Sequence, residues 1–164
     1  MNIFEVNLSA SPVGGKKEIH VPSLPRNFLL FKTDLFVFRQ RDEDIDNWCV
    51  GGDCAGWFYV RLLLVEHIRQ DLDPVMEDWG WTFAVSVDGV RVSVNAWAYV
   101  GIENCWLFGL ESDGGWFRRQ PRERLMVAKS IVADALETMM AADSRIEKHA
   151  WFADNPFESN VEGF

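Results

Sequence analysis

The chain has 164 residues, of which 48% are hydrophobic and 25% are charged, proportions that are typical of a globular protein and exclude a disordered or collagen-like chain. Asp and Glu number 25 against 16 Lys and Arg, which gives a formal net charge of −9. This acidic balance argues against a general binder of nucleic acid or anionic membranes, because such binding depends on Lys and Arg that neutralise phosphates.

Processing signals and cysteines point to a cytoplasmic protein. The N-terminus has no basic region followed by the apolar run of a secretory signal, and no window is apolar enough to span a membrane. The three cysteines, Cys49, Cys54 and Cys105, are an odd number in a chain too large to need disulfides. A disulfide between Cys49 and Cys54 is expected only in an oxidising setting.

The first element for which the sequence predicts a conformation is an apolar stretch over residues 28–38, which Lys32-Thr33-Asp34 interrupts. Its Phe and Val residues favour the extended conformation, as one long strand or as two short strands around a turn. The residues that follow predict an acidic loop that carries Asp42, Asp44 and Asp46.

A helix is predicted from Gly56 to Leu72, where apolar residues recur at steps of three and four. Further apolar residues, among them Val60 and Leu64, widen this stripe, so we expect the helix to pack on more than one side. Pro74 disfavours helical dihedrals at the residue before it, and the helix is therefore expected to end there.

The clearest segment is a three-stranded antiparallel meander. From Trp81 to Val87, apolar and polar residues alternate with the period of a half-buried strand. Asp88-Gly89 is the strongest short hairpin signal, because a type I′ turn needs positive φ at both central residues. A second alternating run extends from Val90 to Tyr99, and a turn around 101–104 leads to a third strand over 105–111.

The last helix is predicted to start at or just after Pro121, because a proline in the first turn removes an N–H that would have no partner there. We expect this helix to fray between Ala142 and His149, and residues 151–164 to form an acidic, aromatic tail that docks on the body. The predicted fold of residues 1–150 is a single α+β domain, a two-layer sandwich with both helices on one face of an antiparallel sheet.

Eight tryptophans make an aromatic surface the first candidate for function. Trp97 and Tyr99 share the polar side of their predicted strand, so we expect them to face outward and to contact a partner as aromatic anchors do at interfaces. The alternative is that these rings fill the core or cover the second face of the sheet.

Charged clusters are the second candidate. The acidic loop and the acidic run over residues 71–78 predict negative patches that steer a basic partner, with solubility as the alternative. Arg118, Arg119 and Arg122 gather at the start of the last helix, where free N–H groups also favour an anion. The alternative for this cluster is a solvated helix start.

No spacing of residues predicts catalysis or a metal site. Cys49 and Cys54, with His67 nearby, lack the second pair of ligands that a four-coordinate zinc site needs. The G-x-S-x-G pattern and the glycine patterns of phosphate-binding loops are both missing. We therefore expect neither a metal nor a cofactor.

The sequence favours a non-catalytic acidic module that binds a basic protein partner, without nucleic acid or membrane. In size, acidity and element order it is similar to several groups of small bacterial accessory proteins, such as toxin-neutralising immunity proteins and type III secretion chaperones, and an inhibitor fits the same pattern. One alternative is a small enzyme with a Trp-lined carboxylate or Cys–His site, in a pocket between the meander and residues 56–72. Another is a structural subunit that self-associates through its sheet face as a homo-oligomer.

Overall fold

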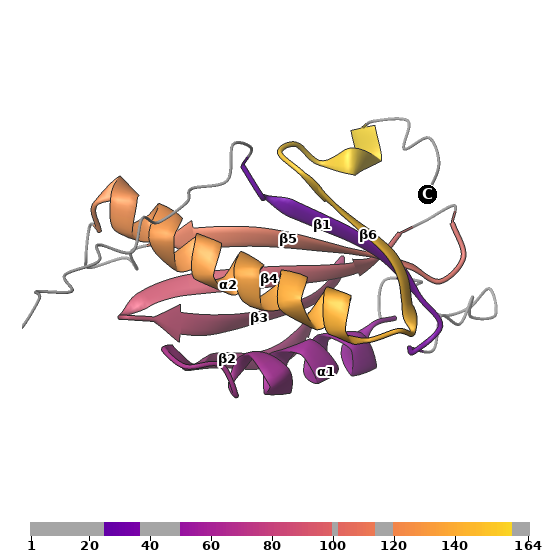
Figure 1. The fold of residues 1–164 in the computed structure, drawn as a ribbon, viewed down its shortest axis with the longest axis horizontal. Coiled ribbons are helices and arrows are strands. Elements are labelled where there is room, and N and C mark those ends of the chain that lie inside the picture. Colours follow the sequence, from indigo (N-terminus) through magenta and orange to yellow (C-terminus); the bar gives the residue numbers. More distant parts are fainter. Residues whose placement is uncertain (1–24, 37–49, 100–101, 114–119, 159–164) are drawn as a thin grey trace, which may run out of the picture.

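A computed structural model of the chain describes residues 25–36, 50–99, 102–113 and 120–158 (Figure 1). The strands of these residues form one sheet in the order β2-β3-β4-β5-β1-β6, with every neighbouring pair antiparallel, and both helices lie on one side of it. The predicted α+β two-layer sandwich is confirmed. The elements are β1 (Phe28–Thr33), α1 (Gly52–Leu62), β2 (Ile68–Glu77), β3 (Gly80–Val87), β4 (Val90–Ala98), β5 (Cys105–Asp113), α2 (Arg122–Ala142), β6 (Ile146–Phe152) and the 3-10 helix η2 (Pro156–Glu158).

The meander of β3, β4 and β5 is confirmed. Its hairpin turn has φ values of 49° at Asp88 and 79° at Gly89, the positive pair that the Asp-Gly sequence predicts. The alternating apolar residues of β3 and β4 point toward the helices, and none of these side chains is more than 1% exposed: Phe83, Val85, Val87, Val90, Val92 and Val94. Period-two patterning therefore determines which face of the sheet is covered.

Aromatic rings of α1 and the central strands form the middle of the core. Phe58 of α1 is fully buried, and its ring centroid lies 5.4 Å from that of Phe31 in β1 and 4.9 Å from that of Phe108 in β5. Both contacts are edge-to-face, the geometry that aromatic quadrupoles favour. The apolar stripe of α2 closes the other half of the core with Ala128, Val132, Leu136 and Met140.

The prediction of a helix from Gly56 to Leu72 is wrong in its second half. The chain leaves α1 at Leu62, turns through His67, whose φ is 70°, and begins β2 at Ile68. Ile68 is fully buried opposite Val87 of β3, so its apolar character serves a sheet and not a helix. Among the described strands, β2 is the outermost on its side of the sheet, and Pro74 is tolerated there because an outer strand leaves some N–H groups without a ladder partner.

The predicted fraying between Ala142 and His149 is also wrong. The helix α2 ends at Ala142, and Ile146 begins β6, which pairs with β1 and extends through Phe152. The strand therefore includes the first two residues of the predicted tail. Its partner β1 lies more than a hundred residues earlier in the chain, so the pairing has no local sequence signal.

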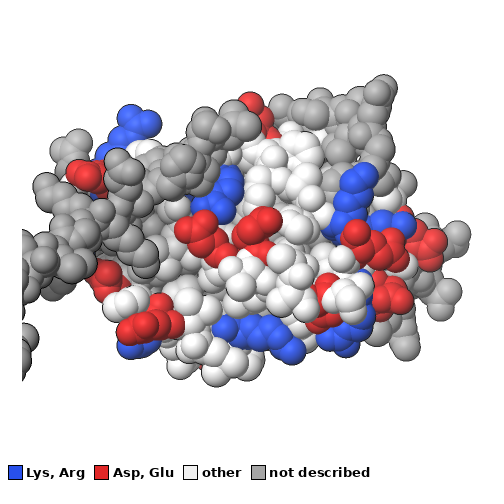
Figure 2. Space-filling view, in the orientation of Figure 1, with Lys and Arg blue, Asp and Glu red and all other residues white. Residues whose placement is uncertain are grey.

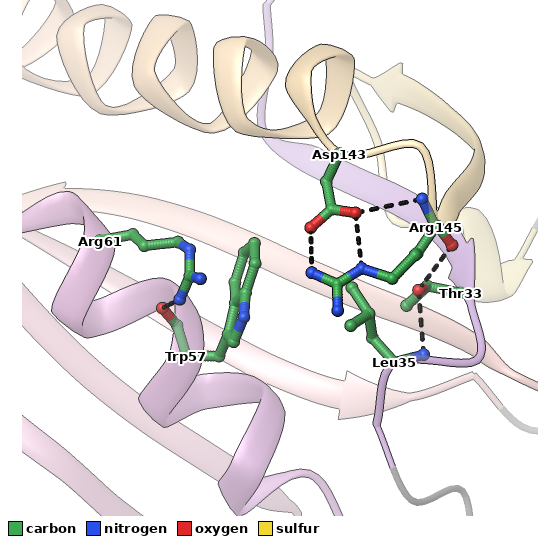
Figure 3. Close-up of polar contacts among 6 residues, drawn as sticks. All are labelled: Thr33, Leu35, Trp57, Arg61, Asp143 and Arg145. Atoms are coloured by element: carbon green, nitrogen blue, oxygen red, sulfur yellow. Dashed lines mark hydrogen bonds and ion pairs between the residues drawn. The ribbon is translucent and has the colours of Figure 1, made fainter.

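A polar seam joins the C-terminal ends of the two helices (Figure 3). The guanidinium of Arg61 in α1 lies over the Trp57 ring, 3.5 Å from its centroid. After α2, Arg145 donates two side-chain hydrogen bonds to Asp143, and these bonds lower the pKa of that carboxyl to about 2. The hydroxyl of Thr33 donates to the carbonyl of Arg145, which ties the end of β1 to the turn before β6.

Candidate binding surface

Five acidic residues lie on β2 or in the turns on either side of it. We name them the acidic edge: Glu66, Asp71, Asp73, Glu77 and Asp78. All five are exposed. Acidic and basic side chains are interspersed over the side of the molecule that carries the helices (Figure 2). Along β2 itself the only base is Arg69, so the acidic edge concentrates negative charge at the border of the sheet.

Two arginines on elements close to β2 in the fold already have contacts. Arg91 of β4 forms an ion pair with Asp71 at 3.4 Å. Arg61 of α1 lies over Trp57, in the seam between the helices. Among the described residues, Asp71 is the member of the acidic edge that has a Lys or Arg ion pair within 4.0 Å, whereas Glu66, Asp73, Glu77 and Asp78 have none.

A buried tyrosine fixes β2 against α1. The Tyr59 hydroxyl donates to Oδ1 of Asp73 at 2.7 Å, and the Gln70 amide donates to the same oxygen at 3.0 Å. Burial, together with the hydrogen bond and charge of Asp73, raises the pKa of Tyr59 to about 12. The phenol therefore stays protonated and remains a donor at every physiological pH.

Exposed apolar side chains accompany the acidic edge. Val60 of α1 is 58% exposed, Leu64 in the turn after α1 is 82% exposed, and Val75 and Met76 of β2 are also exposed. These are four of the seven large apolar side chains exposed among the described residues. The expectation that α1 packs on more than one side is therefore wrong at Val60 and Leu64, and an apolar surface lies beside the charged strand.

The backbone of β2 is a poor template for an added strand. Its register with β3 shifts twice, between Gln70 and Leu72 and between Leu72 and Val75. Pro74 has no N–H to donate. Charged residues of β2 lie both before and after Pro74 in the chain. Bulges, proline and charge are the devices that discourage edge-to-edge pairing, so a partner at this edge binds through side chains.

Trp97 and Tyr99, the predicted aromatic contacts, lie on the face of the sheet opposite the helices. Trp97 is partly buried, with its ring 5.3 Å from that of Trp79 and directly over Gly109 of β5. Tyr99 is 8% exposed because the ring of Phe157 stacks on it at 4.8 Å. Its hydroxyl donates to the Pro156 carbonyl, so the chain's own C-terminal segment covers this contact.

Of the other predicted site residues, the structure describes only a few. Asp42, Asp44, Asp46, Arg118, Arg119 and Cys49 lie outside the described residues. Arg122 is exposed in the first turn of α2, and no side chain caps that helix start. Cys54 is fully buried, and burial, reinforced by the charge of Asp53, raises the pKa of its thiol well above the ordinary value. Within the described ranges no three His, Cys, Asp or Glu side chains converge as metal ligands.

The pocket expected for an enzyme, between the meander and residues 56–72, is filled by packed rings. There the centroid of Tyr59 lies 5.5 Å from that of Phe83. A hollow of about 180 Å³ lies elsewhere, between the β3–β4 turn and α2, where Arg124 donates to the carbonyl of Asp88. Neither described cysteine lines it. The described part of the chain also contains no helix with the length and apolar character of a membrane span.

One carboxylate fastens the outer strand β6 to α2. Glu137 accepts a hydrogen bond from the Trp151 indole at 2.7 Å, and Nε2 of His149 lies 2.9 Å from its other oxygen. Arg26 lies over the Trp151 ring and also pairs with Asp134 of α2. This cluster stabilises β6, which has no sheet neighbour on its outer side among the described strands.

Glu137→Gln is expected to lower the free energy of unfolding by about 1 kcal/mol at neutral pH, a modest value because the Glu137 side chain is 43% exposed. Burial raises the pKa of Glu137, but the hydrogen bonds from His149 and Trp151 and the charges of His149 and Arg26 outweigh it, so the pKa lies below its ordinary value of 4.5. The stabilisation is therefore present above pH 4.5 and is lost as the pH falls through the folded-state pKa.

Urea denaturation, from neutral pH down through the folded-state pKa of Glu137, tests the prediction. The variant is expected to lose less stability on acidification than the wild type, whereas Glu103→Gln, at an exposed turn, is expected to behave as the wild type does. Equal pH dependence of Glu137→Gln and the wild type would contradict it.

No protein-family model, curated protein or solved structure matches the chain. A functional proposal consequently depends on the surface of this molecule alone.

Proposed function

We propose that this chain is a non-catalytic acidic module that docks on a basic protein through the acidic edge. The observation that carries the proposal is the location of five exposed acids on β2 and in its flanking turns, beside exposed apolar side chains. Acids at such an edge attract a basic partner over distances near the Debye length, about 10 Å, and the apolar groups stabilise the docked complex. An immunity protein, an inhibitor or a secretion chaperone would be compatible with such a surface.

Asp42, Asp44 and Asp46 belong to the same proposal as steering charges, and the partly buried Trp97 as an aromatic contact on the sheet face opposite the helices. Tyr99 would contact a partner only if the ring of Phe157, which stacks on it, moved away. The proposed compartment is the cytoplasm.

Affinity purification of the tagged chain from its source cell, at low and at moderate salt, tests the proposal. We expect mass spectrometry to identify one basic protein that is retained at low salt and weakened as salt rises, because salt screens exposed charges. A preparation without a stoichiometric partner would contradict the proposal.

Variants that remove charge then test whether the partner docks on the acidic edge. The double variant Glu77→Gln, Asp78→Asn is expected to lower the association rate constant about tenfold at low salt. The matched control Glu123→Gln, Asp134→Asn removes the same charge from two exposed positions of α2, away from β2 and from the sheet face that carries Trp97 and Tyr99. Equal effects of the two double variants would show that docking does not use the acidic edge.

A further inference from the structure

The outward side of α1 is apolar where core packing gives no reason for it. The helix buries one side against the sheet through Cys54, Ala55, Phe58, Tyr59 and Leu62. Val60 and Leu64 follow each other at a four-residue interval on the exposed side. Leu64 lies in the turn directly after α1, where its N–H donates to the carbonyl of Arg61, three residues earlier.

A glycine one turn before Val60 adds a notch to this side. Gly56 lies inside α1, a position where glycine is less favourable to a helix than alanine. A Cβ atom at Gly56 would have no heavy atom within 4 Å, so intramolecular packing does not require the glycine. We name three residues at four-residue intervals, one small and two large apolar ones, the α1 row: Gly56, Val60 and Leu64.

Charge decides which occupant suits the α1 row. A second copy would bring its own acidic edge to the contact, and like charges across an interface oppose association. A cationic partner instead gains from the same acids, which flank the row at Glu66 in the turn after α1 and along the neighbouring strand β2. Charge complementarity therefore favours a basic partner over self-association.

The spacing of the row decides the shape of the partner. Strand addition is discouraged by the bulges and the proline of β2. A ridge of residues at four-residue intervals on a helix fits the grooves of another helix. We infer that the α1 row is the apolar anchor for an amphipathic, cationic helix of the partner, an inference that rests on the proposed function.

Two peptides of identical Leu and Lys composition supply the probes, one patterned as an amphipathic helix and one with strictly alternating residues. Titration of the full chain, followed by amide NMR signals, measures affinity and locates the contact. We expect the helical peptide to shift the signals of α1 and to bind about tenfold more tightly than the alternating peptide.

Variants of the α1 row test the assignment. The double variant Val60→Asp, Leu64→Asp is expected to weaken the helical peptide about tenfold, although it adds attractive charge. Gly56→Gln fills the notch with a neutral, helix-favouring side chain, and is expected to weaken binding several-fold without loss of folding. Met126→Asp changes an exposed apolar residue of α2 and is the matched control, with no effect expected.

The outcomes separate the inference from the proposed function. Equal binding of both peptides, weakened by Glu77→Gln, Asp78→Asn but not by the α1 variants, overturns the helix inference and leaves acidic docking in place. Binding that no variant of either surface weakens overturns both. An effect of Met126→Asp as large as that of the α1 variants overturns the assignment to α1.

Discussion

Phe58→Ala is expected to lower the free energy of unfolding by about 3 to 5 kcal/mol. The Phe58 ring is fully buried between α1 and the sheet, in edge-to-face contact with Phe31 and Phe108. Its removal takes away the transfer free energy of the ring and leaves a cavity that the two strands cannot close. A domain of this size has about 5 to 15 kcal/mol in total, so one substitution removes a large share.

Val60→Ala is the matched control, because Val60 lies on the same helix and is 58% exposed. Its effect on unfolding is expected within about 0.5 kcal/mol. Guanidinium denaturation gives both values from the shift in midpoint at an unchanged slope. A Phe58→Ala cost no larger than that of Val60→Ala would show that the centre of the core lies elsewhere.

The two variants also separate stability from docking. Phe58 anchors the helix whose opposite side carries the α1 row, so its loss is expected to loosen that row and weaken the helical peptide indirectly. Val60→Ala removes two exposed methyl groups from the α1 row and leaves the buried contacts of Phe58 intact. The α1 row is thus proposed to depend on both sides of α1: the side packed on the sheet holds the helix in place, and the exposed side contacts the partner.

The meander could be predicted because its information is local. Alternation in β3 and β4 selects the covered face, and Asp88-Gly89 supplies the positive φ of the turn. The boundary between α1 and β2 could not be predicted in this way. Apolar residues continue at helical intervals past Leu62, and only the pairing of Ile68 with Val87 makes the later ones part of a strand.

The strand β6 shows the same limit. Its residues Ile146–Phe152 alternate weakly, and their extended conformation depends on β1 and on the Glu137 cluster of α2. Propensity is a weak guide at such a strand, because cross-strand contacts decide it.

The candidate surface was predictable only in part. The acidic run over residues 71–78 was visible in the sequence, whereas its position on an outer strand was not, because a helix was expected up to Leu72. The α1 row was missed for a related reason: a wide apolar stripe predicts burial on several sides, and only tertiary packing shows which side stays exposed. Gly56 was expected to be the first residue of this helix, so its position inside α1 could not be recognised before the helix was seen to begin at Gly52.

Gly80→Ala is expected to lower the free energy of unfolding by about 2 to 4 kcal/mol, through backbone strain and a steric clash together. Gly80 begins β3 with a φ of 154°, a conformation that L side chains rarely adopt. A Cβ atom there would lie 2.5 Å from the carbonyl oxygen of Ala96 in β4, and backbone cannot move aside as a flexible side chain can.

Gly89→Ala isolates the strain from the clash. Gly89 also has positive φ, 79°, but a Cβ atom at that turn would have no heavy atom within 4 Å. Its cost is expected near 1 to 2 kcal/mol, and thermal or urea denaturation compares the two variants directly. A Gly80→Ala cost no greater than that of Gly89→Ala would mean that β3 and β4 relax to admit the methyl group.

Gly80 also links the fold to the proposed docking surface. It pairs with Glu77 across the turn between β2 and β3, so its close approach to β4 determines where Glu77 and Asp78 lie. Opening that turn is expected to displace the end of the acidic edge and to lower the affinity for a cationic probe. Gly89→Ala perturbs the opposite end of β3 and is expected to leave that affinity unchanged, so unequal losses of binding would attribute the effect to the position of the acids and not to reduced stability.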